Sequence, residues 1–164
     1  ASELKQTAEI LKADWAKIGA DISVIVFEPG ELNQVVIRPR KYESLLFGEI
    51  IGREPDLFAF WHSSQRNDPG LNVALYANIK ADKFLEEART TADQKMRLEK
   101  LSAFSEEVRK DIPAIFLYSP DFVYVLPEKI KGFVFGRLTT PSDRCANISQ
   151  WYIETDKVWR TFSF

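Results

Sequence analysis

The sequence holds a single histidine, His62, which lies beside Ser63 and six residues after Asp56. A serine, a histidine and a carboxylate are the groups of a nucleophilic triad, in which the carboxylate orients the histidine and the histidine activates the serine. No motif that would form an oxyanion hole accompanies them. The alternative is a hydrogen-bonded histidine at a helix end, and the sequence favours it.

A second candidate is a pair of carboxylates for general acid and base catalysis, drawn from Glu49, Glu54 and Asp56. Acids in a loop are more often solvated or cap a helix, and Asp56 after Pro55 suits a helix N-terminus. The sequence has no nucleophile elbow, phosphate-binding glycine loop or dinucleotide fingerprint. With one histidine and one cysteine, Cys145, we expect no metal site, cofactor or internal disulfide.

The overall charge argues against partners recognised by electrostatics alone. Twenty-two basic and 24 acidic side chains give a formal net charge of −2. The basic residues of segment 95–110 alternate with acids, so that face is nearly neutral, and no nucleic acid is expected. No apolar run approaches the roughly 20 residues needed to cross a bilayer.

Aromatic side chains cluster at Phe58, Phe60, Trp61 and Tyr76. Large rings with few rotatable bonds form either a hydrophobic core or an apolar wall against a ligand. The sequence leaves these two alternatives open.

Hydrophobic periodicity predicts the elements that would position these groups. Residues 4–18 carry a helical stripe that ends before Gly19, and helices are also predicted over 31–37, 81–89 and from Asp93 to about residue 110. Apolar runs predict strands at 22–27, 42–47, 114–118 and 122–126, the last two paired in antiparallel fashion. Segment 133–164 is a polar loop followed by an aromatic tail. We therefore expect an α/β lobe with a mixed sheet and flanking helices. The start, without an initiator methionine or an apolar signal core, suggests a fragment.

Short motifs follow one another in a fixed order along the chain: Thr7-Ala8-Glu9-Ile10-Leu11-Lys12, Trp15-Ala16-Lys17-Ile18-Gly19, Tyr42 through Phe47-Gly48, Pro55-Asp56, Phe60-Trp61-His62-Ser63-Ser64, Asn72, Tyr76-Ala77-Asn78, Asp82-Lys83-Phe84-Leu85-Glu86-Glu87-Ala88-Arg89, Asp93, Arg97, Asp111-Ile112-Pro113-Ala114-Ile115-Phe116-Leu117-Tyr118 and Ile130-Lys131-Gly132. This order resembles the C-terminal part of the family 5 extracellular solute-binding proteins, the oligopeptide and dipeptide receptors of bacterial ABC importers. The resemblance covers nearly all 164 residues.

The resemblance implies a periplasmic-binding-protein-like (type II) lobe. Residues 1–132 would form the C-terminal ligand-binding lobe, and 133–164 a return segment and tail that pack on the missing N-terminal lobe. It implies a binding protein and not an enzyme, which captures a peptide or a related solute outside the cytoplasmic membrane, in the periplasm or lipid-anchored, and delivers it to a membrane permease.

Receptors of this family often carry a tryptophan and an aspartate after a strand-ending glycine, and the aspartate binds the α-amine of the peptide. Here Gly48 is followed by Glu49-Ile50-Ile51-Gly52, so neither residue is present where expected. Glu49 would replace the amine anchor, or the ligand lacks a free N-terminus. Both alternatives place a ligand contact in segment 47–52, which comprises Phe47, Gly48, Glu49, Ile50, Ile51 and Gly52, with Trp61 and His62 nearby. A small hydrolase that uses Glu49, Asp56 or His62, or a protein-interaction domain, are the other functions considered.

Overall fold

The computed structural model describes residues 2–51, 56–134, 136 and 140–153. The chain divides into two compact units. Unit 1 comprises residues 1–50 and 55–115, and unit 2 comprises 51–54 and 116–164. The expected boundary at residue 132 stays a prediction about the longer protein.

The first helix, α1 (Ser2–Ala16), forms where the periodicity predicted it. It ends in a turn closed by Gly19, whose φ of +85° is the left-handed conformation expected of a helix C-cap. Its apolar stripe stays largely uncovered, since Leu4 is 40% and Ile18 80% exposed. The predicted helix over 31–37 is also confirmed, as the short α2 (Pro29–Glu31) continued by a π-helix, Leu32–Ile37.

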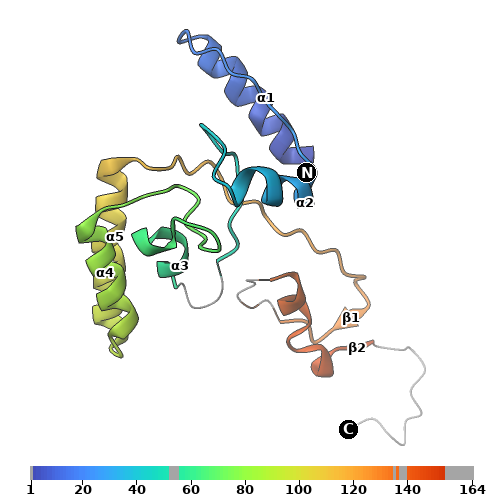
Figure 1. Ribbon diagram of the computed structural model, residues 1–164. Helices are drawn as coiled ribbons and strands as arrows, with labels where there is room; N and C mark the ends of the chain where they lie inside the picture. Colours follow the sequence, from blue (N-terminus) through green and yellow to red (C-terminus); the bar gives the residue numbers. More distant parts are fainter. Residues whose placement is uncertain (1, 52–55, 135, 137–139, 154–164) are drawn as a thin grey trace, which may run out of the picture. The chain divides into compact units, whose positions relative to one another are not determined.

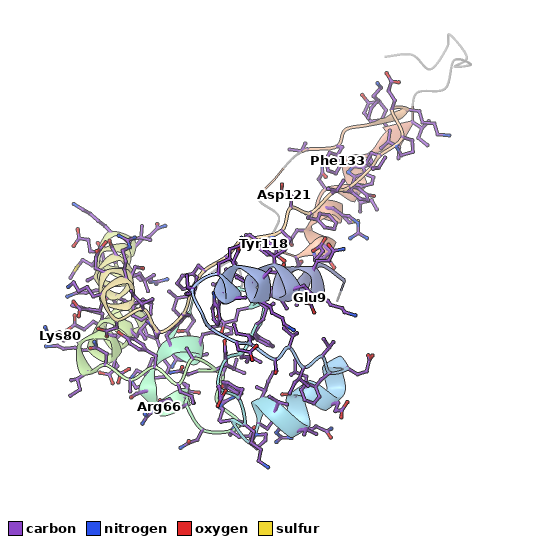
Figure 2. The ribbon with its side chains drawn as sticks, turned by 90° about the horizontal axis from the view of Figure 1, so that it is seen from above. Glu9, Arg66, Lys80, Tyr118, Asp121 and Phe133 are labelled. Carbon is purple, nitrogen blue, oxygen red and sulfur yellow. The ribbon has the colours of Figure 1, made fainter. Side chains whose placement is uncertain are left out.

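The core of unit 1 lies between α4 (Ile79–Thr90) and α5 (Gln94–Asp111), which run side by side (Figure 1). Asn78 caps α4 and Asp93 caps α5, each by accepting backbone N–H groups of the first turn. The short α3 (Phe58–Trp61) packs against α4, and a 3-10 helix, Ser63–Gln65, follows it. The buried core side chains are Trp61, Tyr76, Ala81, Leu85, Phe104 and Val108. Polar side chains such as Lys80 project from the outer side of this pair (Figure 2).

The strands predicted at 22–27, 42–47, 114–118 and 122–126 were wrong for this structure, because none of these segments forms a ladder. Many of their apolar side chains are exposed, including Ile25 (73%) and Val123 (80%). β-propensity reports packing against neighbouring strands, and a strand has no stability without such a neighbour. The expected mixed sheet is accordingly replaced, in the part of the chain that is described, by one two-stranded sheet.

That sheet belongs to unit 2 and pairs β1 (Ile130–Lys131) with β2 (Tyr152–Ile153) in antiparallel register. Gly132 has a φ of +77°, and a Cβ there would overlap the Gln150 carbonyl oxygen. Two short 3-10 helices, Pro141–Cys145 and Ile148–Gln150, lie between the strands. Asn147 stabilises this unit by donating to the Gly132 carbonyl at 2.8 Å and accepting from the Trp151 indole N–H at 3.0 Å.

The α4–α5 core predicts a large cost for cavity formation. Leu85 is 2% exposed, so Leu85→Ala should lower the free energy of unfolding by about 2–5 kcal/mol. Leu98→Ala on α5 is the matched control, because Leu98 is 58% exposed and its truncation should change stability by about 0.5 kcal/mol or less. Urea denaturation of both variants, followed by helical circular dichroism, compares them; similar losses would contradict the placement of this core.

Candidate functional site

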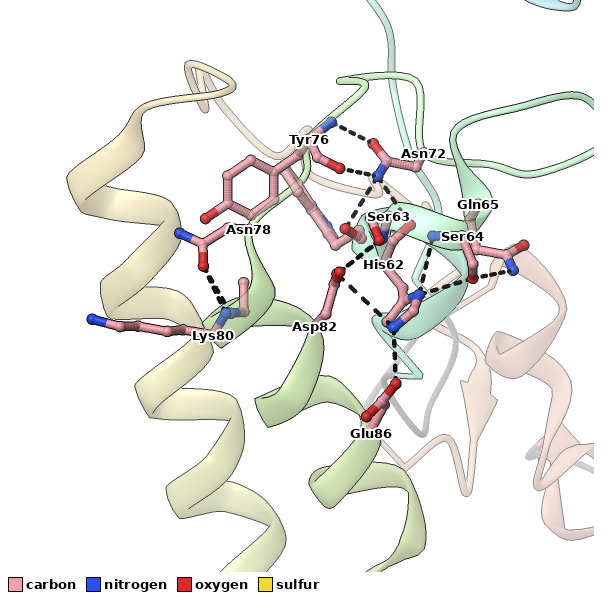
Figure 3. A network of polar contacts seen from close by, with 12 residues as sticks. His62, Ser63, Ser64, Gln65, Asn72, Tyr76, Asn78, Lys80, Asp82 and Glu86 are labelled. Carbon is pink, nitrogen blue, oxygen red and sulfur yellow. Dashed lines mark hydrogen bonds and ion pairs between the residues drawn. The ribbon is translucent and has the colours of Figure 1, made fainter.

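The polar centre of unit 1 is Asn72, which is fully buried (Figure 3). The two N–H groups of its amide face three carbonyl oxygens, those of Trp61 (3.1 Å), His62 (3.1 Å) and Tyr76 (2.9 Å), so one N–H is shared between two acceptors. Its amide oxygen accepts the Tyr76 backbone N–H at 3.1 Å. The Asn72 side chain therefore links the end of α3 (Trp61), the residue after it (His62) and the segment that precedes α4 (Tyr76). A buried side chain whose hydrogen bonds are satisfied in this way holds the surrounding loop in one conformation.

Asp82 on α4 fixes the turn that follows α3. Its carboxylate accepts the Ser63 backbone N–H at 2.9 Å and the Ser63 hydroxyl at 2.6 Å. The Ser63 hydroxyl proton is thus committed to Asp82 and is not available to His62. This geometry excludes Ser63 as a nucleophile activated by the histidine.

His62 lies in a tight polar and aromatic setting and is 8% exposed. Its Nδ1 accepts the Ser64 backbone N–H at 3.1 Å and lies 2.8 Å from the Ser64 hydroxyl. Since a backbone amide can only donate, Nδ1 carries no proton in this arrangement, and Nε2 bears it. Nε2 lies 3.3 Å from the Glu86 carboxylate and 3.9 Å from that of Asp82.

The expected partner of His62, Asp56, is engaged elsewhere. Its carboxylate lies 3.3 Å from Arg89 and accepts the Phe58 backbone N–H at 3.3 Å, as an acid at the start of a short helix does. The triad of Ser63, His62 and Asp56 is therefore wrong, and the alternative of a hydrogen-bonded histidine at a helix end is confirmed. The Phe58 ring stacks on His62 at 4.0 Å and the Arg89 guanidinium lies 4.7 Å from the Phe58 ring.

A second polar group joins α5 to the segment before α4. Asp111 accepts from the Tyr76 hydroxyl and from the Asn78 amide, both at 2.7 Å. The hydrogen bonds from Asn78 and Tyr76 hold the pKa of the Asp111 carboxyl below its ordinary value. Burial, and then the hydrogen bond to Asp111, raise the pKa of the Tyr76 phenol well above its ordinary value.

Of the predicted aromatic cluster, Trp61 and Tyr76 are buried, while Phe58 and Phe60 pack against them in partly buried positions. Trp61 meets Tyr76 and Phe104 edge to face, at 6.3 and 6.2 Å. Of the two alternatives that the sequence left open, a hydrophobic core and an apolar wall against a ligand, the cluster matches the hydrophobic core. Trp61 thus belongs to the core of unit 1 and His62 is buried beside it. A direct contact of either residue with a ligand stays a prediction.

Segment 47–51 has a different character, with apolar side chains facing solvent. Phe47 is 46%, Ile50 81% and Ile51 41% exposed, and a Cβ at Gly48 would meet open space. Glu49 is half-buried, and burial raises the pKa of its carboxyl above the ordinary value. Gly52 and Glu54 lie outside the described residues. Among the described residues, no contact joins Glu49 to Asp56 or His62, so the alternative of a small hydrolase is not favoured.

Within the described ranges, no group of three potential metal-ligating His, Cys, Asp or Glu residues converges. None of the described helices is both long and apolar enough to cross a bilayer.

Comparison with known proteins identifies the relatives of this chain. It is 26% identical over 147 residues to the oligopeptide-binding protein AppA of Bacillus subtilis, which covers 89% of the chain and 26% of AppA. It is 22% identical over 136 residues to the dipeptide-binding protein of Escherichia coli, covering 82% of the chain and 25% of that protein. No protein-family model matches the sequence. The chain spans about a quarter of the length of these relatives.

A solved structure shares the fold. The structure of AppA from Bacillus subtilis in complex with a nonapeptide matches 92% of the chain and 29% of that protein, with a TM-score of 0.69 and 24% identity. The chain therefore has the fold of a periplasmic-binding-protein lobe. It is a relative of the family 5 oligopeptide- and dipeptide-binding proteins over most of its length, consistent with their C-terminal lobe. These relatives are binding proteins, in agreement with the expectation that the chain is not an enzyme.

Asn72 belongs to the motif order that carries the family resemblance, but the sequence did not indicate that its side chain organises unit 1. An isolated asparagine in a loop carries no periodic signal, and its four partners come from three separate positions of the chain. Asn78 directly precedes α4, and an asparagine directly before a helix is a common N-cap, so its role follows from a local sequence signal.

Loss of the Asn72 side chain should destabilise unit 1 severely. Asn72→Ala leaves buried carbonyl and N–H groups without partners, each at a cost of about 1–3 kcal/mol, so we expect a loss of at least about 3 kcal/mol. Asn67→Ala, on the exposed part of the same loop, should change stability by about 0.5 kcal/mol or less. Urea denaturation measures both; a mild effect of Asn72→Ala would contradict its central role.

The lowered pKa of Asp111 predicts a loss of stability in acid. In the window between the ordinary carboxyl pKa of about 3.9 and the lower folded-state pKa, the unfolded chain binds more protons. The stabilising contribution of Asp111 is therefore complete above this window and is lost as the pH falls through it. Asp111→Asn should flatten the fall of the unfolding free energy below about pH 4. Asp21→Asn, an exposed aspartate of the same unit, should leave the slope unchanged, and equal slopes for Asp111→Asn and the parent would contradict the assignment.

Proposed function

We propose that this chain is the C-terminal ligand-binding lobe of the solute-binding component of an ABC importer, which captures peptides outside the cytoplasmic membrane and delivers them to a permease. The observation that carries the proposal is the relationship to oligopeptide- and dipeptide-binding proteins over most of the chain, together with a shared fold. In this proposal residues 1–132 form the lobe and 133–164 return to the N-terminal lobe of the same chain. The protein is periplasmic or lipid-anchored at the outer face of the membrane.

Segment 47–52 is the proposed ligand contact. Its exposed Phe47, Ile50 and Ile51 side chains offer apolar surface for the side chains of a peptide. The backbone of residues 47–51 belongs to no helix or strand, so its N–H and C=O groups are proposed to form β-type hydrogen bonds, the mode by which extended peptides are commonly bound. Trp61, the last residue of α3, and His62, its C-cap, are both buried, and they are proposed to lie near the ligand.

Glu49 is the proposed anchor for the α-amine of the peptide. Its carboxyl is half-buried, and among the described residues it has no ion-pair partner. A carboxylate that has lost part of its hydration gains more from an ammonium group than one in bulk water does. The raised pKa of Glu49 is what such a site shows before its cationic ligand arrives.

The first experiment uses the full-length natural protein. Native mass spectrometry of the purified protein should find a bound pool of peptides, and calorimetry with those peptides should show binding without turnover. The isolated chain, which lacks the opposing lobe, should bind the same peptides at least about tenfold more weakly. A full-length protein that hydrolyses the peptides, or binds none, would contradict the proposal.

Glu49→Gln tests the amine anchor. Removing the charge should weaken binding of a peptide with a free N-terminus about 10- to 100-fold, the value of one charge-assisted hydrogen bond. Glu43→Gln, an exposed glutamate six residues earlier, should leave the affinity unchanged. The N-acetylated form of the same peptide should bind the parent and Glu49→Gln equally, because it carries no ammonium group. Equal affinity of the parent and Glu49→Gln for the free peptide would leave the segment without its proposed anchor.

A further inference from the structure

Side-chain hydrogen bonds from Arg40 hold the loop between the 3-10 helix Ser63–Gln65 and α4. The Arg40 guanidinium donates to the carbonyl oxygens of Arg66 (2.8 Å) and Gly70 (2.6 Å), and also to that of Ile37 (2.9 Å). The Tyr42 hydroxyl donates to the Val73 carbonyl at 2.6 Å. With Asn72 holding it from inside, the loop of residues 66–75, here called the pinned loop, is rigid although it has no regular secondary structure.

The same contacts leave positive charge on this surface. The acceptors of Arg40 are neutral carbonyl oxygens, and Arg66 likewise donates from Nε to the neutral Ser63 carbonyl at 3.1 Å. Lys41 follows Arg40 and is exposed. Asp68 forms a two-pronged pair with Arg38, at 2.9 and 3.1 Å, and it also attracts Arg40 electrostatically. Residues 38–41 and 66–75 thus hold four cationic side chains and one carboxylate, and Arg66 projects into solvent (Figure 2).

Exposed leucines accompany these charges. Leu71 is 49% and Leu75 is 41% exposed. Leu75 and Arg40 have φ angles of +54° and +55°, in the left-handed region that costs a residue other than glycine roughly 1–2 kcal/mol. Such strain persists where the surroundings over-determine the backbone, and it concentrates at functional positions.

Together these features are those of a preformed protein-docking surface. A rigid loop loses little conformational entropy on association, and exposed apolar side chains bordered by charge match the centre and rim of an interface. The charge calls for carboxylates on the partner, and the Arg38–Asp68 pair shows within the molecule the geometry with which a guanidinium binds one. Leucines in fixed positions fit a complementary protein surface better than mobile lipid headgroups.

We infer that the pinned loop with Arg38 and Lys41 is the surface that docks on the membrane partner, against an extracytoplasmic protein face in which acidic side chains border an apolar contact. This inference rests on the proposed function, which supplies a membrane permease as the partner. Peptide binding at segment 47–52 and docking at the pinned loop use different residues, so each can be removed without the other.

The test measures binding of the full-length, peptide-loaded protein to its cognate importer in phosphatidylcholine nanodiscs. Lys41→Glu combined with Arg66→Glu should slow association about tenfold or more at low salt and weaken its salt dependence. Leu71→Ser should raise the dissociation rate constant about three- to tenfold, since a half-exposed leucine would become buried on docking. Peptide affinity and thermal melting should match the parent in both variants.

Lys12→Glu combined with Lys95→Glu is the control, because it reverses two exposed lysines of the same unit and changes the net charge equally. It should leave importer binding unchanged. Unchanged binding of Lys41→Glu/Arg66→Glu, an equal loss in the control, or binding that follows added phosphatidylglycerol in nanodiscs without importer would each overturn the docking surface. A parent protein that binds no peptide contradicts the proposed function and removes this partner, whereas a parent that binds peptide while the variants dock normally overturns the docking surface alone.

Discussion

One buried asparagine sets the geometry of unit 1. Asn72 collects the carbonyl groups of Trp61, His62 and Tyr76 on a single amide, in a place where unpaired backbone groups would be costly. This one side chain decides how α3 turns back toward α4 and how the loop between them leaves the core. Because these hydrogen bonds hold the backbone around Asn72 in one conformation, they also fix the positions of neighbouring side chains such as the Trp61 indole and the Asp82 carboxylate.

The electrostatics of the unit follow from this path. A histidine, a serine and an aspartate are the residue types of a catalytic triad, yet here they form structural hydrogen bonds. The Ser63 hydroxyl donates to Asp82, and His62 accepts the Ser64 backbone N–H. The opposite holds for segment 47–51, where Glu49 is partly desolvated and apolar side chains are exposed. Unit 1 thus contains both a polar network whose hydrogen bonds are satisfied and, in residues 47–50, an exposed apolar surface with a partly buried carboxylate. The exposed surface is where ligand binding is proposed.

Local signals in the sequence predicted the local structure well. The α1 stripe with Gly19, the Asp93 cap and the periodic run of α5 act over one or two helical turns, so their effect does not depend on the rest of the chain. Strands differ, because runs such as 22–27 and 122–126 become strands only beside a partner strand, and none of the described residues supplies one. Each motif is a weak signal by itself, but their order along nearly the whole chain was informative about the family. Asn72 and the Arg40 contacts could not be predicted, since each joins positions that only the folded chain brings together.

The stacking of Phe58 on His62, with Arg89 on the Phe58 ring, gives the protein an intrinsic NMR probe of its local structure. His62 is the only histidine in the sequence, so its imidazole carbon-bound protons give a pair of resonances without overlap from other histidines. The Phe58 ring lies nearly parallel to the imidazole, with 4.0 Å between centroids and 16° between planes, and its ring current displaces these resonances from their solution positions. One proton spectrum therefore reads out whether the helical turn of α3 that brings Phe58 and His62 together is formed, with no label attached to the protein.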